Sequence, residues 1–320
     1  MNDQEQELFR DSLRHATVAH TAEALDAELD DLGWRDALRA DRRAAVSTLF
    51  ELQGRANATS SALDTVLATA LGVDPASTAG VVLPPLGCCR PPGRVTAERL
   101  DVRGMGTAAL GRHATAVVAA EVGQEQVTVV VDTAALELRP ARGLDPTIGI
   151  VHVVGEGLGA TTRSTTAPTA WTSAMARGQL ALAHELVGAS RTMLQLARDH
   201  ALERIQFGRP IAAFQAVRHQ LAESLVAIEE ADAALGAAWD VGSPLDAAVA
   251  KAIGGRSARA VARHCQQVLA GIGFTTEHPF HRYVRRVLVL DGLLGDARSL
   301  TRELGEGLLR TRRLPSIPPL

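Results

Sequence analysis

From about Trp171 almost to its end the chain reads as long helices, and this stretch constrains the fold most. Four helices fit, at about 173–201, 214–239, 245–269 and 281–310. The first carries apolar residues on nearly every side, as a helix does inside a bundle or at an oligomer interface. Aromatic residues make up only 3% of a chain that is 46% hydrophobic, which favours packed helices over strands. The sequence therefore predicts a C-terminal four-helix bundle.

Two regions of different character precede the bundle. Apolar residues at helical spacing fill residues 4–71, whereas 80–93 is rich in Pro and Gly, which exclude a helix interior. β-Branched runs follow at 95–102, 115–122, 127–131 and 148–154, with Gly123 as a turn between two of them. We expect a mainly α fold with an N-terminal helical domain (residues 1–79), a small middle β-domain (80–160) and a C-terminal four-helix bundle (161–320).

Charge and cysteine usage exclude several classes of protein. The net charge is -3 and both signs are interspersed, so nucleic acid is not an expected partner. The acidic N-terminus does not resemble a signal peptide, and no apolar run approaches the ~18 residues of a membrane span. We expect a cytoplasmic protein. Cys88 and Cys89 are adjacent and Cys265 is remote, which predicts reduced thiols and no zinc site.

A short segment beginning at Arg204 carries the first chemical signal. It reads RIQFGRPIAAFQ, in which Gly208 and Pro210 break one helix before the next begins. An Arg fork suits a pyrophosphate, and the face of Phe207 suits a purine. The alternative is a salt-bridged Arg beside a core Phe, and the segment alone does not decide between a dinucleotide site and that structural role.

A second block makes the pattern specific. Residues 267–282 read QVLAGIGFTTEHPFHR, with Gln267, Gly271 and Gly273. Both blocks resemble signatures of the acyl-CoA dehydrogenase superfamily, in the same order and about sixty residues apart on a helical background. In the second block Ala270 stands where the family has its first Gly. The resemblance covers roughly residues 171–307 and implies an acyl-CoA dehydrogenase-like fold.

The resemblance also implies a cofactor, FAD, held between two subunits. Glycines permit close approach to a phosphate, and a Gln amide can recognise an adenine. By this resemblance the nucleotide end of FAD would contact Arg204, Gln206, Phe207, Phe214, Gln267, Gly271 and Gly273.

The catalytic base expected from the resemblance is missing. Family members remove the α-proton of an acyl-CoA with a Glu, which occupies one of two places. Leu294 stands at the first and Gly178 at the second, and neither can take a proton. The nearest carboxylates, Asp291 and Glu185, are displaced by helical spacing that turns them to other faces. We therefore expect no catalytic residue in this chain.

Half a flavin site without a base suggests a homologous partner that supplies the rest. The stretch PFHRYVRRVLVLDGLLG is similar to the reduced subunits of actinobacterial heteromeric acyl-CoA dehydrogenases that shorten steroid side chains. The resemblance thus implies a heterotetramer with a full-length acyl-CoA dehydrogenase subunit, acting on an acyl-CoA.

Other functions remain open at this point. A protein of the same fold could do non-redox chemistry, as a dehydratase or cyclase in natural-product biosynthesis, or could serve only as a structural partner subunit. A metal-dependent hydrolase would need His264, His278 and His281, but no carboxylate ligand accompanies them.

Overall fold

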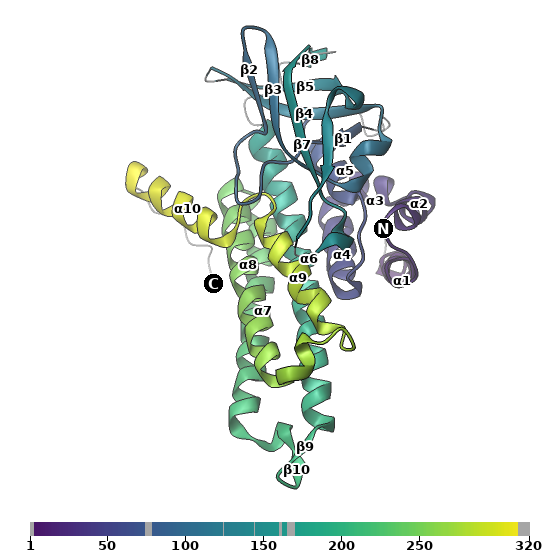
Figure 1. Cartoon of the computed structure of the whole chain (residues 1–320), viewed down its shortest axis with the longest axis vertical. Coiled ribbons are helices and arrows are strands. Elements are labelled where there is room, and N and C mark those ends of the chain that lie inside the picture. The colour runs from purple at the N-terminus through teal and green to yellow at the C-terminus, as the bar shows by residue number, and fades with distance from the viewer. Residues whose placement is uncertain are drawn as a thin grey trace.

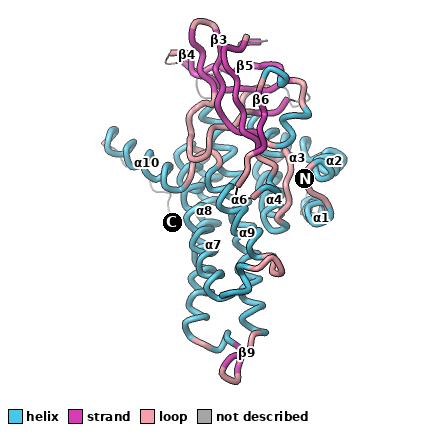
Figure 2. The backbone as a smooth tube through the Cα atoms, viewed as in Figure 1, coloured by secondary structure: helices cyan, strands magenta, loops and turns pink. Residues whose placement is uncertain are grey.

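The computed structural model describes residues 3–73, 79–123, 125–143, 145–159, 162–164 and 170–312. An eight-stranded sheet sits at one end of the molecule, a group of short helices lies beside it, and long helices extend away from both (Figures 1 and 2). The expected order of helices, β-region and bundle is confirmed. The expected boundary at residues 160 and 161, and most of the linker around it, lie outside the described residues.

The helices form two sets. The N-terminal set is α1 (Asp3–Ala19), α2 (Glu23–Asp31), α3 (Trp34–Ala40), α4 (Arg42–Ala56) and α5 (Ala62–Ala70). The C-terminal set is α6 (Ala170–Glu203), α7 (Gln215–Val241), α8 (Pro244–Leu269), α9 (Phe280–Gly292) and α10 (Ala297–Thr311). The fourth predicted helix was therefore wrong as a single helix, because the chain breaks it between α9 and α10, where Leu294 and Gly295 have φ angles of 55° and 94°.

The sheet consists of β1 (Ala79–Val81), β2 (Gly93–Thr96), β3 (Arg99–Gly106), β4 (Thr115–Val122), β5 (Glu125–Asp132), β6 (Glu137–Pro140), β7 (Val151–Leu158) and β8 (Thr162–Ser164). Its order is β6-β7-β3-β2-β4-β5-β8, and β1 pairs in parallel with β4. The central strand β4 is buried on both faces. Ala116 and Val118 join an apolar core that belongs to the sheet, while Val117 and Ala119 join the core of the helices. One strand thus connects the two cores.

Two strand predictions need correction. The run 95–102 is a hairpin of β2 and β3, because Ala97 and Glu98 form its turn with φ angles of 47° and 65°. Neither Ala nor Glu is a usual turn residue, so residue types alone do not predict this turn. In the last run, Ile148 belongs to a 3-10 turn (Pro146–Ile148) and the strand begins only at Val151. The turn at Gly123, with a φ of 62°, is confirmed.

Glycines let α4 cross α6 at very short range. A Cβ atom on Gly54 would lie 2.1 Å from the carbonyl oxygen of Glu185, and one on Gly188 would lie 2.1 Å from that of Glu51. Each helix therefore contributes a glycine to the crossing, and α6 is buried on all sides there. This contact fixes the N-terminal helices against the bundle. Among the described residues, no helix is both long and apolar enough to cross a membrane.

Candidate functional site

The Arg204 segment folds as a small hairpin at the end of the bundle farthest from the sheet (Figure 1). It consists of β9 (Ile205–Gln206) and β10 (Arg209–Pro210), and its turn residues Phe207 and Gly208 both have positive φ angles, 53° and 76°. Phe207 is 91% exposed. The rings of Phe207 and Phe214 pack edge to face with their centroids 6.1 Å apart, and the guanidinium of Arg209 lies 4.5 Å from the centre of the Phe214 ring. These contacts hold an aromatic face toward solvent.

The second block lies at the same end of the bundle. The antiparallel course of α7 and α8 returns the chain to this end, where the 3-10 turn Ala270–Phe274 follows α8. Gln267 is exposed, and no atom lies within 4 Å of the place where a Cβ of Gly271 would stand. Gly273 differs, because it is buried and its Cβ would lie 2.5 Å from Nε2 of Gln266. Its lack of a side chain serves packing within the turn.

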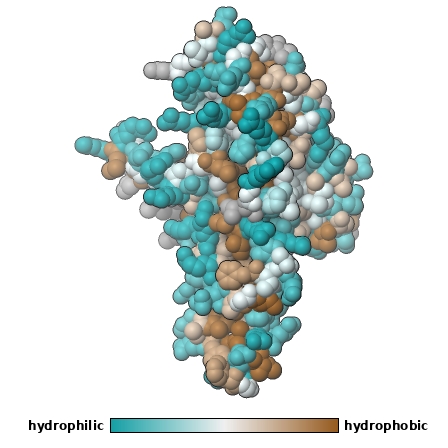
Figure 3. All heavy atoms as spheres, in the orientation of Figure 1, coloured by the Kyte–Doolittle hydropathy of each residue, from teal (hydrophilic) through white to brown (hydrophobic). Residues whose placement is uncertain are grey.

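The exposed end of the bundle fits a dinucleotide in its chemistry. Arg204 and Gln206 are exposed, and Arg204 has no carboxylate partner in the part of the chain that the structure describes. Apolar side chains surround them, and Figure 3 shows this gathering of apolar residues at the foot of the bundle. The exposed ones are Leu202, Ile205, Phe207, Ile272 and Phe274. A contiguous exposed apolar patch rimmed by polar groups is typical of a surface that another molecule covers.

The two expected base positions converge on one small space. A Cβ atom on Gly178 would lie 2.4 Å from Cδ1 of Leu294 and 2.9 Å from Cδ2 of Leu67. Leu294 is fully buried, and the amide of Gln179 donates a 3.0 Å hydrogen bond to its carbonyl oxygen. The place expected for the catalytic base therefore lacks a carboxylate and is also closed. Leucine side chains fill it.

Hydrogen bonds from charged side chains hold the loop that carries Leu294. Lys251 is fully buried, and its Nζ donates to the carbonyl oxygens of Asp291 (2.9 Å) and Gly295 (3.2 Å). Asp291 accepts from Nε of Arg259 at 2.6 Å and from the backbone of Ala297 at 3.0 Å. Its carboxylate joins α8 to the start of α10. Asp291 is therefore a structural group, held in an ion pair with Arg259 and in a hydrogen bond with the backbone of Ala297.

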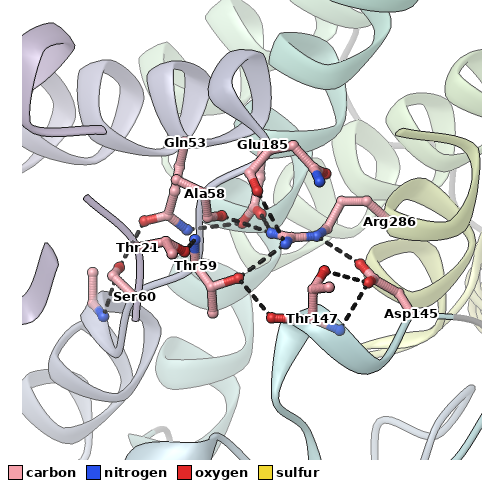
Figure 4. Close-up of polar contacts among 11 residues, drawn as sticks. Thr21, Gln53, Ala58, Thr59, Ser60, Asp145, Thr147, Glu185 and Arg286 are labelled. Carbon is pink, nitrogen blue, oxygen red and sulfur yellow. Dashed lines mark hydrogen bonds and ion pairs between the residues drawn. The ribbon is translucent and has the colours of Figure 1, made fainter. Parts of the chain in front are cut away.

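Glu185, the other displaced carboxylate, belongs to a buried ion-pair network (Figure 4). Nη1 of Arg286 lies 3.2 Å from Glu185 Oε1, and Nε of Arg286 lies 3.0 Å from Asp145 Oδ2. The remaining donors of Arg286 bond to Ala58 O, Asn57 O and Thr59 Oγ1. Burial raises the pKa of the Glu185 carboxyl to about 7, although Arg286 lowers it. The carboxyl faces a guanidinium, so its role is to join α4, α6, α9 and the turn at Pro146.

Arg286 was not singled out in the sequence, since its partners are 101 and 141 residues away along the chain. Its place in the run RYVRR, on a helix whose neighbouring positions are apolar, was the one available signal. The three histidines considered for a metal do not form a site. No group of three or more His, Cys, Asp or Glu side chains that could hold a metal ion occurs within the described ranges.

Comparisons with known proteins agree with this geometry. Residues 169–309 match the family model described as the acyl-CoA dehydrogenase C-terminal domain. Acyl-CoA dehydrogenase FadE34 of Mycobacterium tuberculosis is 46% identical over 121 residues, which are 36% of this chain and 17% of that protein. Acyl-CoA dehydrogenase IpdE2 of the same organism is 37% identical over 123 residues, 38% of this chain and 39% of that protein. Residues 169–309 of the chain are thus similar to the C-terminal domain of acyl-CoA dehydrogenases.

Solved structures extend the likeness to the whole fold. A chain of the "Tcur3481-Tcur3483 steroid ACAD G363A variant" superimposes with a TM-score of 0.82 at 22% identity, over 97% of this chain and 99% of that one. A chain of the ChsE4-ChsE5 complex from Mycobacterium tuberculosis gives 0.76 at 20% identity, over 99% of both chains. The matches to FadE34 and IpdE2 span well under two thirds of those proteins. These structures therefore establish the acyl-CoA dehydrogenase fold for nearly the entire chain.

Proposed function

We propose that this chain is the base-less subunit of a cytoplasmic, FAD-dependent acyl-CoA dehydrogenase whose homologous partner supplies the catalytic Glu. The carrying observation is the contrast between two sites. The space for the base is closed by Leu294 against Gly178, while the dinucleotide-type residues at the foot of the bundle are open. A chain with the second site and without the first can bind a shared cofactor but cannot remove a proton itself.

The residues of the exposed site suggest which part of FAD this chain would contact and which part the partner would contact. Arg204 would pair with the pyrophosphate of FAD, Phe207 would stack on the adenine, and Gln267 would hydrogen-bond to the polar linker or ring. Gly271 leaves the backbone open to close approach. When bound, FAD would supply the hydride acceptor for α,β-desaturation of the acyl group. The partner would contribute the base and most contacts to the flavin ring.

The proposal of a heterotetramer draws on the neighbours named above. Two of the similar structures are named as pairs of proteins, Tcur3481-Tcur3483 and ChsE4-ChsE5, and the first is named as a steroid ACAD. By analogy we propose a full-length acyl-CoA dehydrogenase homologue as partner and a steroid side-chain thioester as substrate. A non-redox enzyme of this fold would instead need an open acyl pocket, and the packing of Leu67 and Leu294 against Gly178 argues against one in this chain.

Substitution of Arg204 tests the assigned role. We expect Arg204→Ala to lower the flavin content of the purified complex, because one charge-assisted contact to a phosphate is lost. Arg198→Ala is the matched control, since Arg198 is exposed near the end of α6, which stops at Glu203 just before Arg204. Flavin content is measured from the visible absorbance per protein. Equal occupancy in both variants would remove Arg204, and with it the shared nucleotide site, from the account.

A further inference from the structure

A wide groove separates α8 from α10. In Figure 1, α10 leaves the bundle on the side opposite α1 and α2. The groove between α8 and α10 has a volume of about 960 Å³, and its walls run from Val249 to Arg263 on α8 and from Ala297 to Leu304 on α10. At a rise of about 1.5 Å per residue, the α8 wall is about 21 Å long. This length is enough for a surface element of another protein, and neither the hairpin nor the base positions line the groove.

The floor of the groove is apolar and incompletely covered. Val249 is 37% exposed, and Ile253, one turn later on α8, is half-buried. On α10, Leu300, Leu304 and Leu308 are four residues apart and share one face. Leu300 is buried, but Leu304 and Leu308 are only half-buried, so the covering of this face ends within the helix. An apolar surface with a polar rim is typical of a face that another molecule covers.

Gly305 on α10 has no packing role among the described residues. It follows Arg298 by seven residues and Thr301 by four, and both of these line the groove, so Gly305 lies on the same side of the helix. No atom lies within 4 Å of the place of its Cβ, and its φ angle is not among the positive ones, so neither crowding nor left-handed backbone requires a glycine there. A glycine inside a helix lowers stability relative to alanine, and close approach of another backbone is a use that offsets this loss.

Positive charge exceeds negative charge along the groove, since five arginines and two aspartates line it. Arg256 and Arg259 each form an ion pair with a carboxylate of this chain. Arg263 and Arg298 form none with any carboxylate in the part of the chain that the structure describes. The one pair of Arg302 lies within α10, spans 3.8 Å and is about two-thirds exposed on both sides, so it holds this guanidinium weakly. Three arginines at the groove are therefore free to pair with carboxylates of another molecule.

The charge of the groove discriminates between two occupants. A two-fold contact between copies of this chain would bring the groove against itself, because the same surface patch then lies on both sides. The α8 arginines of one copy would face Arg298 and Arg302 of the other, and like charges across an interface oppose association. A different subunit with an acidic surface would instead pair with these arginines and cover the apolar floor.

We propose that the groove between α8 and α10 receives an acidic surface of the homologous partner subunit, and that its arginines exclude a second copy of this chain. Apolar side chains of the partner cover the floor, its carboxylates pair with Arg263 and Arg298, and its backbone approaches Gly305. This inference rests on the proposed function, because the partner is the subunit proposed there. It adds the surface and the charge by which that partner is selected.

Analytical ultracentrifugation of this chain with a full-length acyl-CoA dehydrogenase homologue tests the pairing with a partner. We expect R298E/R302E to weaken the complex at least about tenfold, because attractive pairs become repulsive ones. R10E/R103E is the matched control, since it makes the same change of charge at two exposed arginines on α1 and β3, outside the groove. Gly305→Leu is a second variant. Its side chain enters open space in the isolated chain, so it should fold normally and still weaken the complex.

The exclusion of a second copy is tested on this chain alone. The parent chain should not pair through the groove. R298E/R302E should self-associate at least about tenfold more tightly than the parent, because the new carboxylates of one copy would face the α8 arginines of the other. R10E/R103E should leave self-association unchanged, and circular dichroism checks that each variant is folded.

Failure of this inference and failure of the proposed function give different results. If the parent complex forms and carries flavin, but R298E/R302E and Gly305→Leu leave it intact, the groove is not the surface of the partner and the proposed function stands. A parent mixture that forms no complex overturns the proposed function and this inference with it. A parent chain that self-associates, and loses this association in R298E/R302E, assigns the groove to a second copy and overturns the inference alone.

Discussion

The convergence of Gly178 and Leu294 predicts a strong energetic coupling between the two positions. In Gly178→Ala, the new Cβ would stand 2.4 Å from Cδ1 of Leu294. Replacing a helical Gly with Ala gains about 0.5–1 kcal/mol, but overpacking a filled core costs about 1–3 kcal/mol. We expect a net loss of stability of roughly 0–2.5 kcal/mol. Leu294→Ala should cost about 2–5 kcal/mol, because Leu294 is fully buried.

In the Leu294→Ala background the main clash is gone, so Gly178→Ala should become neutral or stabilising. The double-mutant cycle should therefore give a coupling energy of about 1–3 kcal/mol. Urea unfolding followed by circular dichroism measures the four proteins. Gly236→Ala on α7 is the control, because its Cβ would meet no atom within 4 Å and its effect should be the same in both backgrounds. Additivity of Gly178→Ala and Leu294→Ala within about 0.5 kcal/mol would refute the idea that they share one space.

Two further predictions concern buried charges. Arg286→Met should destabilise the chain by about 3–5 kcal/mol in urea unfolding, because Glu185 and Asp145 lose their buried partner, while Arg302→Met on the exposed face of α10 should change stability by less than about 0.5 kcal/mol. Burial raises the pKa of Asp64 from 3.8 to about 7, so the folded state binds a proton that the unfolded state releases, and Asp64 should weaken stability as pH rises from about 4 to 7. Asp64→Asn should remove this pH dependence and stabilise the chain at pH 8 by up to about 4 kcal/mol. Urea unfolding at several pH values measures the effect. A variant less stable than the parent at pH 8 would contradict the raised pKa of Asp64.

Much of the fold could be predicted from the sequence, because the signals were local. The four helical runs are long and periodic, and the two blocks at 204–215 and 267–282 carry turn glycines that determine where helices end. The break between α9 and α10 was missed, since Leu294 adopts a positive φ that leucine rarely takes. The capping box of Asp296 and Ser299 was a readable signal for the start of α10.

The candidate site could be predicted only in part, because the filling of the base position by leucine side chains depends on tertiary packing. The sequence indicates that positions 178 and 294 lack a carboxylate. It does not indicate that the side chain of Leu294 fills the space where a side chain at position 178 would lie. The same holds for the Arg286 network, whose partners come from α6, the segment after α4 and the turn at Pro146. Contacts of this kind depend on how helices cross, and helix periodicity does not specify that.

The most direct test of the central claim is the visible absorption spectrum of this chain purified alone and again together with a full-length acyl-CoA dehydrogenase homologue. Flavin absorbance that appears only in the mixture, with the two chains eluting as one complex, is the result expected for a base-less subunit that shares FAD. A colourless mixture, or two chains that elute separately, would contradict a shared flavin site and would leave the exposed residues at the foot of the bundle without the role assigned to them.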